Sequence, residues 1–175
     1  MNEDLRFPIG QFDNAAKVTP QKRKEFIQTI EELPENFRQA VKGLSEKQLD
    51  TPYRPEGWTV RQLVHHVADS HLNSYIRFKL GLTEVAPTIK PYEEALWAET
   101  ADGKSAPVEI SLNLIDAIHA RWTIFLKSMS DADFNRKINH PESGEMSLDS
   151  LLALYDWHSR HHTAHITKLR ERNGW

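Results

Sequence analysis

The stretch YDWHSRHHTAHI, residues 155–166, places four histidines within eight positions. It lies inside a longer run, residues 147–175, whose apolar residues return at helical spacing: Leu148, Leu151, Leu152, Tyr155, Ile166 and Leu169. Residues three and four apart share one face of a helix, so this run predicts a long amphipathic helix. Ser147 is the expected N-cap, and basic residues precede Gly174 near the end, as is typical of a helix C-terminus.

Three segments upstream show the same periodicity. The first begins at Thr19 and Pro20, extends to about residue 44, and contains Pro34, which is expected to kink it. Thr59 caps the second, residues 60–82, and the third covers residues 107–129. Their apolar positions are Phe26, Ile27, Ile30, Leu33, Phe37 and Val41, then Val60, Leu63, Val67 and Phe78, and finally Leu114, Ile118, Trp122 and Phe125. Four amphipathic helices without convincing strands predict an all-α protein built as a four-helix bundle.

The connections contain the irregular segments. Residues 84–106 are interpreted as a long, structured crossover with a short helical candidate at residues 92–99. Residues 135–147 contain a proline and a glycine and predict a small turn or hairpin. Residues 1–18 show no clear period and are expected to form an N-terminal arm. The whole chain, 1–175, is therefore predicted to be one domain with small irregular insertions.

Composition excludes several classes of function. The chain has 22 basic and 25 acidic residues, a net charge of −3, which argues against a nucleic-acid partner. It contains no cysteine, so disulfides, thiolate ligands and a cysteine nucleophile are excluded. No apolar run is long enough for a membrane span, and the opening MNEDLRFPIGQF is not typical of a secretory signal. We therefore expect a cytoplasmic protein, whose nine histidines are its main candidate metal ligands.

The last helix brings two histidine pairs to neighbouring positions. With His158 taken as zero, its apolar stripe centres at roughly 60° and His162 falls at about 40°. His165 lies at about −20° and His161 at about −60°, further toward the flank. The pair His158/His162 is therefore the better buried, and its i,i+4 spacing is the one that HExxH zinc enzymes use, although their glutamate is absent here. A hydrogen-bonded core histidine and a solvated helix face are the alternative interpretations.

A third ligand has to come from a facing helix. The second helix offers His65, His66 and His71. His71 lies close to the apolar stripe of this helix, so a core role is its alternative interpretation. His65 points well away from the stripe, and His66 occupies its edge. Spacing alone leaves this choice open. His119 and His140 have no histidine partner at helical spacing and are expected to be structural or exposed.

Several segments together resemble the DinB-like superfamily, and within it the YfiT-type metal-dependent hydrolases. These segments are GWTVRQLVHHVADSHLNSYIRFKL (57–80), DWHSRHHTAHI (156–166), FPIGQF (7–12), LDTPYRPEGWTVRQ (49–62) and RNGW (172–175). The resemblance covers almost the whole chain and implies a DinB/YfiT-like four-helix bundle. It implies that His66, His158 and His162 hold one divalent metal per subunit, zinc being the expected ion and nickel the alternative. It also implies a cytoplasmic homodimer.

Three neutral imidazoles on zinc leave a position for water, as in catalytic zinc sites. The expected function is therefore hydrolysis of a small-molecule substrate. The candidates for a general acid or base are Asp69, Tyr155, His161 and His165, each with packing, capping or pairing as its alternative. Asp156 is interpreted either as a carboxylate that orients a ligand histidine or as a surface partner of Arg160. The resemblance assigns no role to His65, His71, His161 or His165.

Two other functions remain open at this point. Zinc lowers the pKa of a bound thiol as well as that of water, so a transferase of a low-molecular-weight thiol of the bacillithiol type is the first alternative. A non-catalytic metal-binding bundle is the second. An arginine near an open site would favour the thiol, but Arg61, Arg77 and Arg121 are expected to be surface charges.

Overall fold

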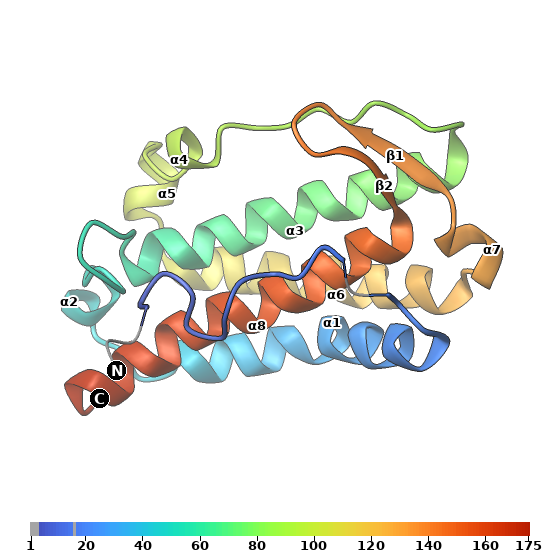
Figure 1. The fold of residues 1–175 in the computed structure, drawn as a ribbon. Coiled ribbons are helices and arrows are strands. Elements are labelled where there is room, and N and C mark those ends of the chain that lie inside the picture. The colour runs from blue at the N-terminus through green and yellow to red at the C-terminus, as the bar shows by residue number, and fades with distance from the viewer. Residues whose placement is uncertain (1–3, 16) are drawn as a thin grey trace.

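Four long helices dominate the computed structural model, which describes residues 4–15 and 17–175 (Figure 1). They are α1 (Pro20–Val41), α3 (Val60–Thr83), α6 (Val108–Ser128) and α8 (Leu148–Asn173). The connections contain the short helices α2 (Glu46–Leu49), α4 (Glu94–Trp97), α5 (Ala101–Ser105) and α7 (Asp131–Phe134), and the strands β1 (Lys137–His140) and β2 (Gly144–Ser147). The predicted four-helix bundle is confirmed.

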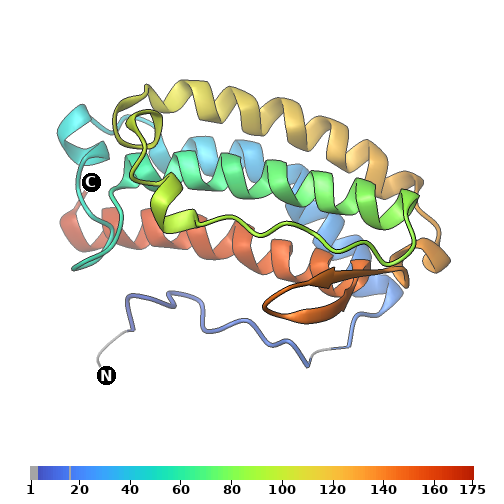
Figure 2. The same ribbon diagram turned by 90° about the horizontal axis from the view of Figure 1, so that it is seen from above.

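The order of the helices follows from the long crossover. α1 packs against α8 and α6, and α3 packs against α6 and α8. In Figure 2 the colours show that α3 and α6 run in the same direction, as do α1 and α8. A parallel pair needs a connection that returns along the bundle, and residues 84–107 provide it by running back over α3 (Figure 2). The predicted crossover is therefore confirmed.

The helix ends are set by the local residues that the sequence suggested. The side chains of Thr19, Thr59 and Ser147 accept hydrogen bonds from backbone N–H groups in the first turns of α1, α3 and α8. Gly174 ends α8 in the left-handed conformation, φ 67°, which glycine adopts without steric cost. Pro34 lies inside α1, and the helix continues beyond it to Val41.

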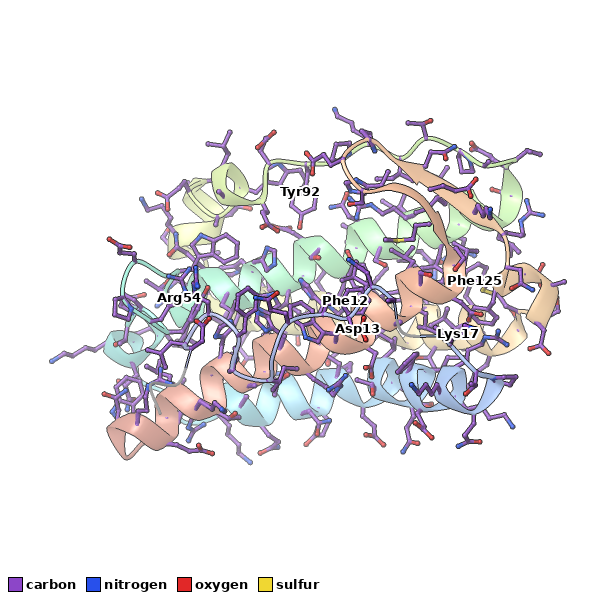
Figure 3. All side chains as sticks on the ribbon, viewed as in Figure 1. Phe12, Asp13, Lys17, Arg54, Tyr92 and Phe125 are labelled. Atoms are coloured by element: carbon purple, nitrogen blue, oxygen red, sulfur yellow. The ribbon has the colours of Figure 1, made fainter. Side chains whose placement is uncertain are left out.

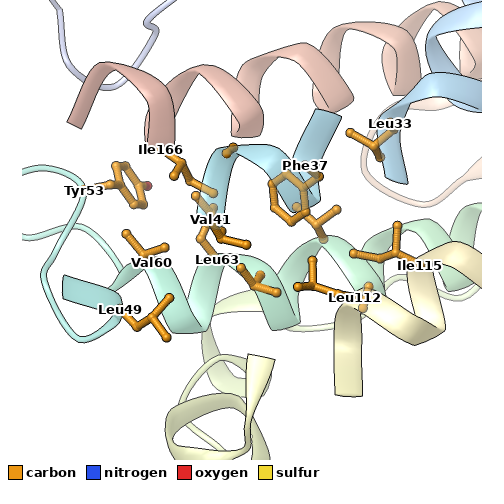
Figure 4. Packing of buried hydrophobic residues seen from close by; sticks show 14 of the residues in the cluster. Leu33, Phe37, Val41, Leu49, Tyr53, Val60, Leu63, Leu112, Ile115 and Ile166 are labelled. Carbon is orange, nitrogen blue, oxygen red and sulfur yellow. The ribbon is translucent and has the colours of Figure 1, made fainter. Parts of the chain in front are cut away.

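The core divides into two apolar clusters along the bundle axis. Figure 4 shows one of them, in which side chains of α1, α3, α6 and α8 interdigitate: Leu33, Phe37, Val41, Val60, Leu63, Leu112, Ile115 and Ile166. The other surrounds the fully buried Trp122. One expected core position is wrong, because Leu114 is 39% exposed. α6 faces both α1 and α3, so its inward stripe runs through Leu112 and Ile115, and Leu114 lies on the outer face.

The irregular segments follow the predictions with two differences. Residues 137–147 form the hairpin, an antiparallel ladder from Lys137 opposite Ser147 to His140 opposite Gly144, so one short pair of strands is present. The helical candidate at residues 92–99 is the shorter α4, and α5 follows it. Within residues 4–15 and 17–175, none of the helices combines the length and apolar content required to cross a bilayer.

The described part of the N-terminal arm has no regular structure and lies along α8 (Figure 1). The indole N–H of Trp157 donates a hydrogen bond of 3.1 Å to the carbonyl of Gly10. The ring of Phe12, labelled over α8 in Figure 3, lies 6.0 Å from that of Trp157. The ring of Phe7 lies 6.2 Å from that of His161. The arm therefore covers a flank of α8 that would otherwise face solvent.

Candidate metal centre

Three histidines converge between α3 and α8. His66 lies on α3, His158 and His162 lie on α8, and one nitrogen from each falls within 4.8 Å of the other two. The Nε2 atoms of His158 and His162 are 3.1 Å apart. The structure thus brings together the i,i+4 pair that the helical wheel selected and the second histidine of His65–His66. That these three side chains hold a metal remains a prediction.

Burial keeps the three rings neutral. It lowers the pKa of His66 to about 4, and it holds the pKa of His158 and of His162 well below the usual value, with neighbouring histidines adding to the effect. A neutral imidazole has one nitrogen lone pair, the form that binds a metal. Tetrahedral zinc with Zn–N distances of about 2.0–2.1 Å separates two ligand nitrogens by about 3.3 Å. The 3.1 Å between His158 and His162 is close to this separation, so the residues fit a divalent metal.

His65 contributes to a different interface. Its Nδ1 lies 2.7 Å from the hydroxyl of Ser111 on α6, and its Nε2 lies 3.1 Å from the carbonyl of Ala106. The prediction that His65 points away from the site is confirmed. Its ring is buried all the same, because α6 packs beside α3 on that side.

His161 and His165 are buried as well, which differs from the flanking position expected for them. Their Nε2 atoms lie 3.0 Å apart. Trp157 stacks on His161 with ring centroids 4.2 Å apart, and the ring of Tyr53 lies 4.1 Å from that of His165. The N-terminal arm and the loop before α3 cover this flank, which a single-helix wheel cannot show. Together with His162 the two form a second group of nitrogens within 4.8 Å, but the two groups share His162.

A pocket of about 460 Å³ gives access to the three converging histidines. Its remaining walls are formed by Tyr53, Arg54, Glu56, Gly57, Trp58, Glu94, Trp157 and His161. A larger cavity, about 710 Å³, lies between α1 and α8, but it contains none of the nine histidines. The smaller pocket is therefore the candidate site, because it is lined by all three converging histidines.

Two carboxylates at this pocket were missed by sequence reasoning. Glu94 begins α4 and is exposed at the rim of the pocket, and its pKa is raised by desolvation from the neighbouring protein and by the nearby charge of Glu142. Glu56 lies in the turn where the N–H of Gly57 donates to the carbonyl of Arg54, and it has a φ of 59°. Only the turn residues of RPEG suggested a loop there, and nothing in their spacing indicated that the loop covers the histidines. Arg54 is labelled beside this loop in Figure 3.

Of the acid–base candidates suggested by the sequence, His161 lines the pocket, whereas Tyr155, Asp69 and His165 do not. Tyr155 donates a hydrogen bond of 3.1 Å to the backbone carbonyl of Ser70, which is a structural role. Asp69 is half-buried, and burial raises its pKa to about 6. Asp156 pairs with Arg160 at 2.5 Å, as one interpretation held, but its carboxylate is buried rather than on the surface.

The three arginines considered from the sequence lie outside the pocket over the histidines, whereas Arg54 lines it. Arg61 is buried, not a surface charge, because it forms ion pairs with Asp50 and Glu46 at the start of α3. The guanidinium of Arg121 is exposed and lies 5.7 Å above the ring of Tyr75. Neither these two nor Arg77 lines the pocket over the histidines, as far as the described residues show.

The fold and the site define a helical-bundle protein with a histidine-lined pocket fit for a divalent metal. Residues 29–166 match the model of the DinB superfamily, and the chain belongs to that superfamily. It is 57% identical over 173 residues to a protein of Bacillus mycoides (strain KBAB4), with 99% of each chain covered, that is named "Putative metal-dependent hydrolase". A protein of Bacillus cereus (strain B4264) with the same description is 56% identical over 172 residues, which cover 98% of this chain and 99% of that one.

A solved structure shows the same architecture. YfiT from Bacillus subtilis is 48% identical, covers 98% of both chains and superposes with a TM-score of 0.95. It is described as "a probable metal-dependent hydrolase with an unusual four-helix bundle topology". In the present chain, the parallel α3–α6 pair and its crossover depart from a simple up-and-down bundle.

Proposed function

We propose that this protein is a metal-dependent hydrolase of a small molecule, in which His66, His158 and His162 hold one divalent metal. The observation that carries the proposal is the convergence of three neutral imidazoles at an accessible pocket. The printed names of the relatives from Bacillus mycoides and Bacillus cereus and of YfiT support it. Zinc is the proposed ion because it is the common metal of three-histidine sites, and nickel is the alternative.

The other residues of the pocket wall supply proton transfer and substrate contacts. A divalent metal bound in such a site lowers the pKa of water toward 7 and polarises a carbonyl. Glu94 and Glu56 are the carboxylates on the pocket wall, and we assign proton transfer to one of them. Glu94 suits a general base, because desolvation and the charge of Glu142 raise its pKa. Tyr53, Trp58 and Trp157 supply apolar surface that packs against a substrate and excludes water.

Activity and metal content have to be measured together. The purified chain, treated with a chelator and then reloaded with zinc or nickel, is assayed on a panel of esters, amides and thioesters. We expect about one metal per chain, and turnover that appears only after reloading. His158→Ala is expected to lose both, and His140→Ala, a hairpin variant outside the pocket, to lose neither. Metal binding without turnover of any substrate would leave the non-catalytic bundle as the better interpretation.

The same panel separates hydrolysis from thiol transfer. An electrophile is added with and without a low-molecular-weight thiol. Turnover that requires the thiol would replace the hydrolase by the transferase. Arg54 lines the pocket and could bind an anionic thiol as well as an anionic substrate, so the preference for hydrolysis rests on the printed names of the relatives.

We further propose that the protein is a cytoplasmic homodimer. The absence of cysteine supports an intracellular site, and the dimer rests on the resemblance to YfiT-type proteins. Sedimentation equilibrium of the full chain tests the dimer, and a mass of about 20 kDa, that of one chain, would contradict it.

A further inference from the structure

A chain of hydrogen bonds leads from one predicted metal ligand through the core to the opposite helix. Nδ1 of His158 on α8 lies 3.0 Å from Nε2 of His71 on α3. Nδ1 of His71 lies 2.9 Å from Nε2 of His119 on α6. Nδ1 of His119 lies 2.6 Å from the backbone carbonyl oxygen of Ile30 on α1. All four long helices of the bundle therefore contribute one member.

The last member determines the direction of every bond. A carbonyl oxygen only accepts, so Nδ1 of His119 carries its proton and donates to Ile30. A neutral imidazole has one N–H, so Nε2 of His119 accepts and Nδ1 of His71 donates. By the same step Nε2 of His71 accepts and Nδ1 of His158 donates. Nε2 of His158 is then left with its lone pair, and this is the atom that lies 3.1 Å from Nε2 of His162.

Pro34 explains why the carbonyl of Ile30 is available. In an α-helix that carbonyl accepts from the N–H four residues later, and here the residue four positions later is a proline, which has no N–H. The proline ring also crowds the carbonyl four positions before it. Ile30 is 0% exposed and His119 is 1% exposed, so water does not satisfy this acceptor in their place. A proline that looks unfavourable in a helix interior thus leaves a buried acceptor for His119.

We propose that Pro34, by freeing the carbonyl of Ile30, and His119 and His71, by their hydrogen bonds, hold His158 in the Nδ1–H tautomer with its Nε2 lone pair facing the metal position. The proposal rests on the metal site of the proposed function. His71 and His119 are positioning residues, since neither lines the pocket. The chain ends on a backbone carbonyl, so it orients a ligand and does not carry protons to solvent.

If His119 served only to fill space in the core, a side chain of similar volume could replace it. Packing requires volume, whereas the proposed chain requires a donor and an acceptor at His119. An amide has both, separated much as the two imidazole nitrogens are, so glutamine can replace the ring in the chain. Methionine has similar volume but no strong donor or acceptor. The pair His119→Gln and His119→Met therefore separates hydrogen bonding from volume.

The first measurement uses the metal-free full chain. Nitrogen-15 NMR of labelled histidines reports which ring nitrogen is protonated. We expect a protonated Nδ1 and an unprotonated Nε2 at His158, His71 and His119. A protonated Nε2 at His158 overturns the proposal. This result does not depend on whether any variant folds or on whether the chain turns over a substrate.

The second measurement is zinc affinity by competition with a chromophoric chelator, with helicity followed by circular dichroism. His119→Met is expected to weaken binding by roughly 10- to 100-fold, the usual effect of losing a group that orients a ligand histidine. His119→Gln is expected to stay within about threefold of the unchanged protein. His140→Met and His140→Gln serve as matched controls on the hairpin, with no change expected.

The outcomes separate this inference from the proposed function. Equal zinc affinity for His119→Met and the unchanged protein overturns the positioning role. If the unchanged chain binds no zinc but shows the predicted tautomers, the metal site is wrong and the hydrogen-bond chain stands. If zinc binds and the tautomers are reversed, the metal site stands and the positioning chain is wrong.

Discussion

The Nε2 atoms of His158 and His162, one helical turn apart on α8, lie 3.1 Å from each other and face His66 across the bundle. Three positions further along, His161 and His165 repeat the spacing at 3.0 Å but pack against the rings of Trp157 and Tyr53. The two histidine pairs differ in the side chains that face them. The first has an imidazole from another helix, and the second has aromatic rings that bind metals poorly.

This difference predicts which substitutions abolish metal binding. We expect each of His66→Ala, His158→Ala and His162→Ala to weaken zinc binding by more than about 100-fold, because each variant leaves only two imidazoles to hold the metal. Elemental analysis after gel filtration measures the loss, with His140→Ala as the control. Loss of metal in His165→Ala with retention in His66→Ala would assign the site to the second group instead.

Removing the metal is expected to leave the fold intact. Two apolar clusters fill the bundle on either side of the histidines, and neither cluster includes His66, His158 or His162. A structural zinc contributes its binding free energy to folding, and a catalytic one contributes far less. Circular dichroism of the chelated chain should therefore retain nearly all of its helical signal. Collapse of the helix on chelation would support the structural interpretation of the metal.

The sequence predicted those parts of the protein that depend on periodicity within one helix. The caps at Thr59 and Ser147 and the pair His158/His162 are local properties, and the structure confirms their geometry. The wheel could not choose His66 over its neighbours, because that choice depends on how α3 is rotated against α8. The chain from His71 to His119 was missed for the same reason, since its bonds join different helices.

The pocket walls were beyond prediction for another reason. Glu94 and Glu56 belong to connections, where side-chain direction follows no period. Their positions depend on how residues 51–58 and the crossover fold back over α3. Leu114 shows the same limit in the core, where an apolar residue at helical spacing proved to lie on the outer face.

The turn over the pocket predicts a gain in stability from one substitution. Glu56 has a φ of 59°, a left-handed conformation that costs a residue with a Cβ roughly 1–2 kcal/mol. Glu56→Gly removes that cost, but glycine also gives the unfolded chain more conformational freedom, which offsets part of the gain. The free energy of unfolding should therefore rise by roughly 1 kcal/mol. Urea denaturation measures the gain. Glu56→Ala removes the same carboxylate but keeps the Cβ, so an equal gain in that variant would show that strain is not the cause.

Stability is expected to fall in acid because of His119. Burial lowers its pKa to about 4, below the value near 6.5 for an exposed histidine. The unfolded chain then binds more protons between about pH 6.5 and pH 4, so this contribution is complete above pH 6.5 and is lost as pH falls toward 4. The shift corresponds to on the order of 3 kcal/mol.

Urea midpoints of the metal-free chain from pH 7 to pH 4.5 measure this dependence. His119→Gln has no group that titrates in this range, so its stability should fall less steeply than that of the unchanged protein. His140→Gln is the control at an incompletely buried histidine. Parallel slopes for His119→Gln and the unchanged protein would contradict the assignment to His119.

Pro34→Ala is expected to change stability and metal affinity in opposite directions. The substitution restores an N–H inside α1, and a proline in a helix interior costs about 3 kcal/mol relative to alanine. Thermal unfolding should therefore shift to higher temperature. The restored N–H competes with His119 for the carbonyl of Ile30, so the tautomer of His158 is held less firmly and zinc binding weakens, by less than in His119→Met because a carbonyl has two lone pairs. Both quantities are measured on one preparation, by calorimetry of the metal-free chain and by chelator competition. A rise in thermal stability with unchanged zinc affinity would show that Pro34 has no part in positioning His158.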